Sequence, residues 1–238
     1  MSVTFNYDVW FTRFNDANGG LFKLKSYLND KQAYTFHMEN SWSAFDLNGE
    51  EKNILYNDPD GKATIDMFYT DIQAMKELIS NQFIVYNATL VETLFYETFY
   101  LVFMENPKKI NNIIFEQFSN DKDKLGLTLN ELLDHDSKES YIETLCEKAA
   151  SLCNGGKFKD SFKRLIRQLN AAPIDQSNKN IIIDLVEKRN SIVHENNTYE
   201  LEDEYFRSLS ESTYFLLDYI RDNMNSLGIP IIDTINNP

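Results

Sequence analysis

The clearest pattern in the sequence is a helical spacing of apolar residues that begins near residue 63. Five apolar residues recur every three or four positions from there: Ile65, Phe68, Ile72, Met75 and Ile79. A second helix is expected from about residue 82 to residue 105, where Asn106-Pro107 ends it. Because this second segment is apolar on nearly every side, we expect it to be central to a bundle or to a subunit interface.

The chain continues as helices separated by turn signals. Helical spacing covers residues 108–118, 128–133, 140–152, 158–169, 177–195 and 202–226. The signals that end these segments are Gly155-Gly156, Pro173, Asn196-Asn197 and Gly228. We therefore expect an all-α protein, with a helical bundle over residues 63–226 and a short C-terminal tail over residues 227–238.

Residues 1–62 have a different pattern. Helical pieces are expected in the first half, broken at Gly19-Gly20, because two glycines disfavour a helix interior. Residues 33–37, 41–49 and 57–61 read as short extended pieces and turns. These residues are expected to form a mixed, partly irregular N-terminal appendage, for which the sequence indicates no role.

Composition narrows the class of protein further. Hydrophobic residues make up 42% of the chain, which is enough to bury a sizeable core. The formal net charge of −14 disfavours loose binding along a polyanion, although it leaves room for a local basic pocket. The N-terminus lacks the basic flank and apolar run of a signal peptide, and no apolar stretch is long enough to span a membrane. These features predict a cytoplasmic protein without a membrane partner.

The two cysteines, Cys146 and Cys153, lie seven residues apart on one predicted helix. Helical rise separates their Cα atoms by about 10 Å, which is too far for a disulfide. We expect two free, buried thiols in a reducing compartment.

Candidate chemistry centres on the helix predicted over residues 177–195. On a wheel of about 100° per residue, Arg189 lies in the middle of an apolar arc formed by Ile181, Ile182, Leu185, Val186, Ile192 and Val193. An arginine there keeps its charge, so it must be paired or must line a cavity or interface. One interpretation is a structural ion pair with Glu92 or Glu97, which lie on the most apolar helix.

The position of His194 suggests a second role for Arg189, as one side of a binding groove. It follows Arg189 by five residues, about 140° around the helix and about 7.5 Å along it, so the two side chains would flank a groove. Asn190 lies four residues before His194, where its amide could orient the imidazole. The last helical turn also favours an imidazolium through the helix dipole.

At these residues the chain resembles the HEPN superfamily (higher eukaryotes and prokaryotes nucleotide-binding domain). The family's motif is an Arg, four to six residues and a His, often with a polar residue after the Arg; here it reads R-N-S-I-V-H from Arg189 to His194. The resemblance covers roughly residues 63–226, but only the motif is specific. One toxin subgroup has a Tyr two residues after the His, whereas this chain has Asn196.

The resemblance implies a compact bundle that dimerises, with two motifs facing one cleft. Many members are metal-independent ribonucleases in toxin–antitoxin, CRISPR and anti-phage abortive-infection systems, while others are inactive interaction domains. An endoribonuclease with an antitoxin or another regulatory protein as partner is therefore one expectation, and a catalytically silent module binding a protein or nucleotide is the other. In the first, His194 transfers protons and Arg189 stabilises the charge that develops on phosphorus.

Two further patterns bear on RNA binding and on cofactors. Lys159, Lys163 and Arg167 recur every four residues and form a basic stripe, the best candidate for contacts with RNA phosphates and otherwise a solvated helix face. Asp134-His135-Asp136 lacks further histidines nearby, so we expect no metal site. No nucleotide-binding loop or hydrolase motif is present, and no cofactor is expected.

Overall fold

The chain is all-α, as the sequence predicts. A computed structural model describes residues 3–45, 48–111, 125 and 135–236. The helices are α1 (Tyr7–Asn29), α2 (Lys31–Ser41), α3 (Pro59–Glu105), α7 (Lys138–Asn154), α8 (Phe158–Leu169), α9 (Gln176–Glu195) and α10 (Asp203–Ser226). The last four match the predicted helices to within two residues at each end. Residues 108–111 are helical too, but the rest of the helix predicted to residue 118, and the one predicted over 128–133, lie outside the described residues.

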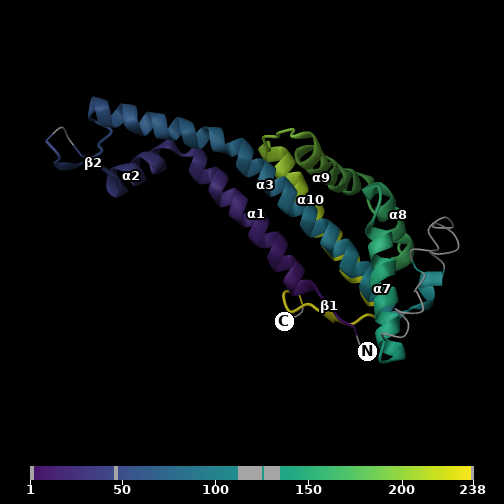
Figure 1. Ribbon diagram of the computed structural model, residues 1–238. Helices are drawn as coiled ribbons and strands as arrows, with labels where there is room; N and C mark the ends of the chain where they lie inside the picture. The colour runs from purple at the N-terminus through teal and green to yellow at the C-terminus, as the bar shows by residue number, and fades with distance from the viewer. Residues whose placement is uncertain (1–2, 46–47, 112–124, 126–134, 237–238) are drawn as a thin grey trace.

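In the part of the chain that the structure describes, four short strands form two small sheets. β1 (Phe5–Asn6) pairs in parallel with β4 (Ile231–Ile232), and β2 (Ser43–Phe45) pairs antiparallel with β3 (Glu51–Asn53). β2 lies within the extended piece predicted at residues 41–49, whereas β3 lies just after it. The first pair joins the two ends of the chain, which lie at the same end of the molecule (Figure 1).

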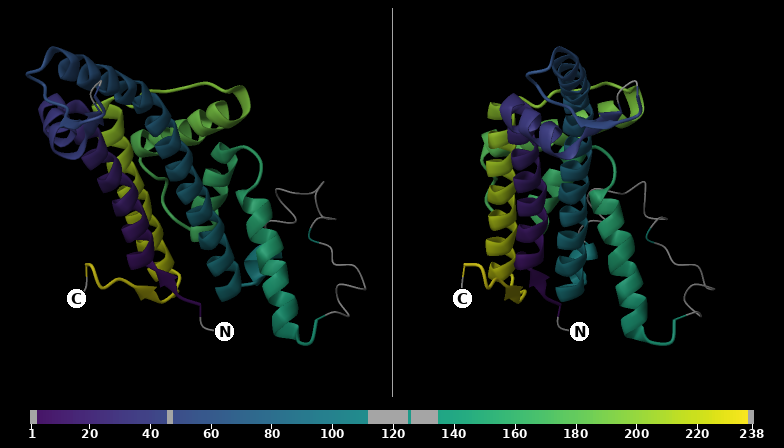
Figure 2. Two further views of the ribbon diagram at one scale, coloured as in Figure 1. Left: turned by 60° about the vertical axis from the view of Figure 1, so that its left-hand side comes forward. Right: turned by 90° about the vertical axis from the view of Figure 1, so that its left-hand side faces the viewer.

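The first helix differs from the sequence prediction, because α1 runs unbroken through Gly19-Gly20. Its buried residues Trp10, Phe14, Leu21 and Leu28 recur at helical spacing on one face. Burying that face outweighs the roughly 1 kcal/mol that each glycine costs in a helix. α1 lies along α3 and α10 (Figure 2) and contributes to the main core, although the sequence predicts an appendage there.

A second difference concerns residues 33–37, which are helical in α2 where the sequence predicts an extended piece. The carboxylate of Asp30 accepts hydrogen bonds from the backbone N–H groups of Gln32 and Ala33, which caps the helix. Tyr34 and Met38, four residues apart, are buried against Ile54 and Ile65. Capping and burial on one face together favour the helix.

The third difference is that α3 is one helix of 47 residues where the sequence predicts two. The expected break falls at Ser80 and Asn81, which are buried within the helix. Their side chains accept hydrogen bonds from the loop after α9: Ser80 Oγ from the N–H of Leu201 (3.3 Å), and Asn81 Oδ1 from the N–H of Tyr199 (2.9 Å). The polar pair therefore anchors a distant loop and does not end the helix.

The molecule has a bundle and a projecting arm. In the bundle, α3 packs against α1, α7, α8, α9 and α10 around the main core. The N-terminal part of α3 extends beyond the bundle together with α2 and the β2–β3 hairpin, as Figure 1 shows. A second, smaller core holds this arm together: Tyr34, Met38, Ile54 and Ile65. None of the described helices combines the length and the apolar character needed to cross a membrane.

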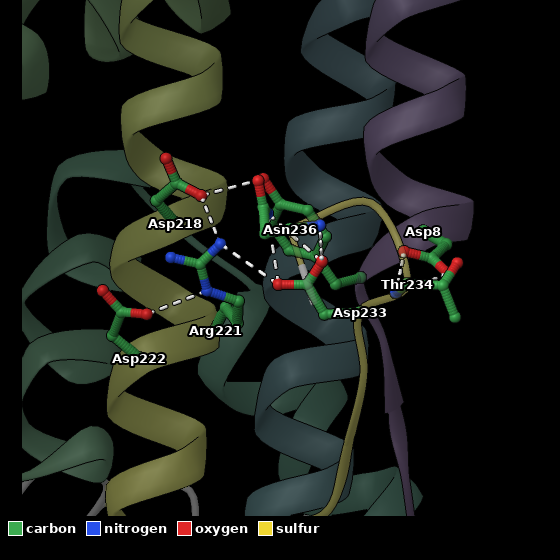
Figure 3. A network of polar contacts seen from close by, with 8 residues as sticks. Asp8, Asp218, Arg221, Asp222, Asp233, Thr234 and Asn236 are labelled. Atoms are coloured by element: carbon green, nitrogen blue, oxygen red, sulfur yellow. Dashed lines mark hydrogen bonds and ion pairs between the residues drawn. The ribbon is translucent and has the colours of Figure 1, made fainter. Parts of the chain in front are cut away.

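The C-terminal tail is fixed to the bundle by a polar network around Arg221 of α10 (Figure 3). Arg221 forms ion pairs with Asp218 (2.9 Å), Asp222 (2.8 Å) and Asp233 (3.4 Å). Asp8 of α1 accepts hydrogen bonds from the backbone N–H and the hydroxyl of Thr234. The network thus joins the tail to the first and last helices.

Replacing Arg221 with alanine should lower the free energy of unfolding by about 1–3 kcal/mol, because the Asp233 side chain, only 4% exposed, loses its cation. Urea denaturation of the wild type and Arg221→Ala measures the difference. Arg207→Ala on the same helix is the control, because Arg207 is exposed and forms no ion pair within the described part of the chain. Equal losses in the two variants would contradict the assignment.

Both cysteines are free and buried, as predicted. Burial raises the pKa of Cys146 to about 11 and that of Cys153 to about 12. Since the thiolate is the reactive form, a thiol reagent at pH 8 should label neither cysteine in the folded protein and both in urea. Rapid labelling of the native protein would contradict this packing.

Candidate functional site

The predicted motif lies on the second half of α9. The carboxylate of Asp175 caps the start of the helix by accepting from the N–H of Asn178 (3.1 Å), and Ile182, Leu185 and Val186 are buried. The helix ends where Asn196 adopts a left-handed conformation (φ 56°), which asparagine tolerates better than most residues. This explains in local terms why asparagine stands two residues after His194.

Contacts with α3 fix the direction of α9. Arg189 contacts Glu92, and Tyr199, after the end of α9, contacts Asn81, so α9 runs antiparallel to α3. Asn154, at the end of α7, donates to the backbone carbonyl of Glu92 (3.1 Å), which fixes this turn of α3 from a third helix. Arg189 therefore meets a rigid part of the bundle.

The guanidinium of Arg189 is held from two sides. One terminal nitrogen donates to the carboxylate of Glu92 in an ion pair, and the other donates to Oδ1 of Asn190 (2.9 Å). The Arg189 side chain is 21% exposed, and its Nε is buried with no hydrogen-bond partner among the described residues. Glu97, the other carboxylate considered from the sequence, makes no contact with Arg189 in the described part of the structure. The guanidinium thus stands at the edge of the core, oriented but still reachable from solvent.

His194 is exposed in the last turn of α9. Asn190 is also exposed, but its oxygen accepts from Arg189, and no described contact joins it to the imidazole. The guanidinium is a charged donor on the adjacent residue, which accounts for the difference from the predicted pairing. The imidazole is left open to solvent, while Asn190 helps to position the arginine.

The backbone that carries His194 is fixed by a polar cluster that the sequence did not suggest. The hydroxyl of Ser191 donates to Glu195 (3.0 Å) and accepts from Asn197 (2.5 Å) and from the Tyr199 hydroxyl (3.2 Å). Asn197 also donates to Glu195 (3.0 Å). In sequence, Asn196-Asn197 indicates only the end of a helix, because the partners depend on how the following loop folds back.

The surface beside the motif is more open than predicted. Val193, expected on the buried arc of α9, is 54% exposed, whereas the neighbouring Ile192 packs against the core. On α3, which was expected to be covered on every side, an exposed stripe contains Gln82, Tyr86, Thr89 and Thr93, and Tyr86 is 50% exposed. The antiparallel register places this stripe level with the end of α9. Val193 of α9 and Tyr86 of α3 are therefore two half-exposed apolar side chains at the level of the motif.

The predicted basic stripe lies on α8. Lys159, Lys163 and Arg167 are exposed, opposite the buried Phe162 and Leu165. Lys163 forms an exposed ion pair with Asp160 (2.9 Å). No contact within the described residues joins the stripe to Arg189 or His194, so the structure supports an exposed cationic face but does not connect it directly to the motif.

The structure describes two residues of the segment Asp134-His135-Asp136, at which the sequence predicts no metal site. Nδ1 of His135 lies 3.0 Å from the Ser140 hydroxyl, and the imidazole contacts Tyr141 edge-on. Asp134 lies outside the described residues. No group of three or more potential metal ligands occurs in the described ranges, 3–45, 48–111, 125 and 135–236.

Comparisons with family models, with curated proteins and with solved structures find no match to this chain. The resemblance to the HEPN superfamily therefore rests on the segment Arg189 to His194 and on the agreement with an all-α bundle.

Proposed function

We propose that this chain is a metal-independent endoribonuclease of HEPN type that works as a homodimer. The observation that carries the proposal is the pairing of an oriented, partly exposed Arg189 with an exposed His194 at the end of the same helix. The biological setting, anti-phage defence or toxin activity under the control of an antitoxin or regulatory protein, comes from the family resemblance.

The reaction needs three groups from the protein: a base, an acid and a positive charge near the phosphorus. A base removes the proton of the ribose 2′-hydroxyl, whose oxygen attacks the adjacent phosphorus, and an acid protonates the departing 5′-oxygen. The products are a 2′,3′-cyclic phosphate and a 5′-hydroxyl. One chain offers one His194, so a dimer would supply both proton-transfer groups, and Arg189 would neutralise the negative charge on phosphorus.

The other residues have supporting roles in this proposal. Glu92 and Asn190 are positioning residues, because both hydrogen-bond the guanidinium and restrict its orientation. The α8 stripe of Lys159, Lys163 and Arg167 would contact RNA phosphates outside the cleavage site. The exposed surface around Tyr86 and Val193 would be covered by the second copy.

A second candidate function is a catalytically silent helical module that binds a protein or a nucleotide. The ion pair between Arg189 and Glu92 favours it, because a carboxylate in contact with the guanidinium offsets the positive charge that a phosphate would meet. The net charge of −14 favours it as well.

An RNA cleavage assay separates the two functions. Purified wild type, Arg189→Ala and His194→Ala are incubated with mixed RNAs in EDTA, and the fragments are resolved on a denaturing gel. Cleavage by the wild type with loss in both variants is expected. Equal cleavage by all three proteins, or none by the wild type, would refute the nuclease proposal.

A further inference from the structure

The arm carries a concentration of exposed apolar side chains that the proposed function does not use. Four large residues of the arm, taken here as residues 31–78, form what we call the arm patch: Trp42 (48% exposed), Met67 (55%), Met75 (50%) and Leu78 (54%). The arm projects away from the bundle, as Figure 1 shows; Figure 2 gives two further views of it. A group of large apolar side chains this open marks a contact surface.

The members of the arm patch share one face. At about 100° per residue, Met67, Met75 and Leu78 of α3 lie within about 80° of one another. The ring of Trp42 lies 5.4 Å from that of Phe68, which is about 20° from Met75 around α3, so the tryptophan borders the edge of the same face. From Met67 to Leu78 the face extends about 16 Å at helical rise, which is three turns. These dimensions suit another helix packed along α3.

The charge around the arm patch is negative. Residues 31–78 contain nine acidic and four basic residues, a formal charge of −5. Asp71 is exposed in the middle of the patch face. Three of the four cations in residues 31–78 face away from Asp71: Lys31 forms an ion pair with Asp66 (2.7 Å), Lys31 and Lys62 lie over the ring of Tyr56, and Lys76 is about 140° around α3 from Asp71.

The negative charge of the arm favours some binding partners of the arm patch over others. A nucleic acid or an anionic membrane would be repelled by the acidic side chains. A second copy of the chain would bring its own negative arm against the first. A protein helix with an apolar stripe flanked by lysines or arginines would cover the apolar side chains and pair with the carboxylates.

We propose that the arm patch is a docking site for a basic amphipathic helix of another protein. The helix lies along the exposed face of α3 with its apolar side chains on Met67, Met75 and Leu78, and its cations reach Asp71. This proposal does not rest on the ribonuclease activity, because none of its residues belongs to the Arg189–His194 site.

The test uses two labelled synthetic helices of 18 residues, one built of leucine and lysine and the other of leucine and glutamate. Fluorescence anisotropy measures the binding of each helix to the full chain at 150 mM salt. The patch variant combines Met67→Gln, Met75→Gln and Leu78→Gln, which keep the charge. The control variant combines Val9→Gln, Phe215→Gln and Ile235→Gln, which change exposed apolar residues elsewhere.

The wild type and the control variant should bind the leucine–lysine helix equally. The patch variant should bind it at least 10-fold more weakly, and so should the wild type with the leucine–glutamate helix. Asp71→Lys, a single exposed change, provides an independent variant and should also weaken binding. Emission from Trp42 should shift to the blue on docking, whereas the buried Trp10 should not respond.

Equal affinities for the patch and control variants would overturn the proposal, because attraction to the acidic protein as a whole would then explain the binding. Self-association of the wild type that the patch variant abolishes would identify a second copy as the occupant and would also overturn it. Patch-dependent binding to vesicles of anionic lipid would assign the surface to a membrane instead.

Discussion

Replacing Phe95 with alanine should lower the free energy of unfolding by about 3–5 kcal/mol, among the largest stability losses expected of a single change in this chain. Phe95 lies on α3 and is fully buried. Its ring centroid is 5.0 Å from those of Phe158 and Phe162, which face it from α8. The substitution removes the ring from a three-ring cluster and leaves a cavity between the two helices.

Urea denaturation followed by circular dichroism measures the loss in Phe95→Ala. Phe36→Ala is the matched control, because Phe36 is 69% exposed and its loss should change the stability by less than about 0.5 kcal/mol. If the two variants unfold at the same urea concentration, α8 does not pack on α3 as described.

Replacing His194 with alanine should lower the rate of RNA cleavage by roughly 10²–10⁴-fold, the range that a general acid or base contributes. Because the imidazole is exposed, the thermal midpoint of unfolding should stay within about 1–2 °C of the wild type, as surface substitutions have small effects. Single-turnover cleavage rates and thermal melts measure the two quantities on the same preparations.

His37→Ala provides the control for His194→Ala, since His37 is also exposed but lies on α2 in the arm. It should cleave RNA at the wild-type rate. Similar rates for His37→Ala and His194→Ala would show that His194 has no part in the reaction, and would favour the silent helical module.

The helices that sequence reasoning located well have their signals close together in the chain. α8 matches its predicted range, because a regular apolar face is followed within four residues by the stop signal Pro173; the helix ends at Asn170, which is in a left-handed conformation. α9 starts after the capping residue Asp175 and ends at Asn196. In both, the spacing and the stop signals are local and agree with each other.

The errors arise where distant contacts decide the local structure. Nothing near Gly19-Gly20 in sequence shows that α1 packs along α3 and α10, and that packing keeps the helix continuous. Ser80 and Asn81 resemble a break in sequence, but their partners are the backbone groups of a loop about 120 residues later. A reading of local spacing cannot weigh such contacts.

In the candidate site, too, some contacts could be predicted from the sequence and others could not. An ion pair between Arg189 and a glutamate on the most apolar helix could be anticipated, because both charges need a partner in apolar surroundings. The contact of Asn190 with Arg189 and the exposure of Val193 could not, because they depend on side-chain conformations and neighbours that the spacing of residues does not give. The angle of a residue on a helical wheel gives the direction of its side chain, but it does not show whether another part of the chain packs against that side chain.

The proposed reaction, in which Arg189 and His194 cleave RNA through its 2′-hydroxyl, can be tested directly. Its most direct test incubates the wild type and His194→Ala, in EDTA, with an RNA pool of random sequence and with the same pool made of 2′-deoxynucleotides, and identifies the products by mass spectrometry. The wild type should convert only the RNA to fragments ending in 2′,3′-cyclic phosphate and 5′-hydroxyl, and His194→Ala should leave both pools intact. Cleavage of the 2′-deoxy pool, equal cleavage of RNA by the two proteins, or no cleavage by the wild type would contradict the claim.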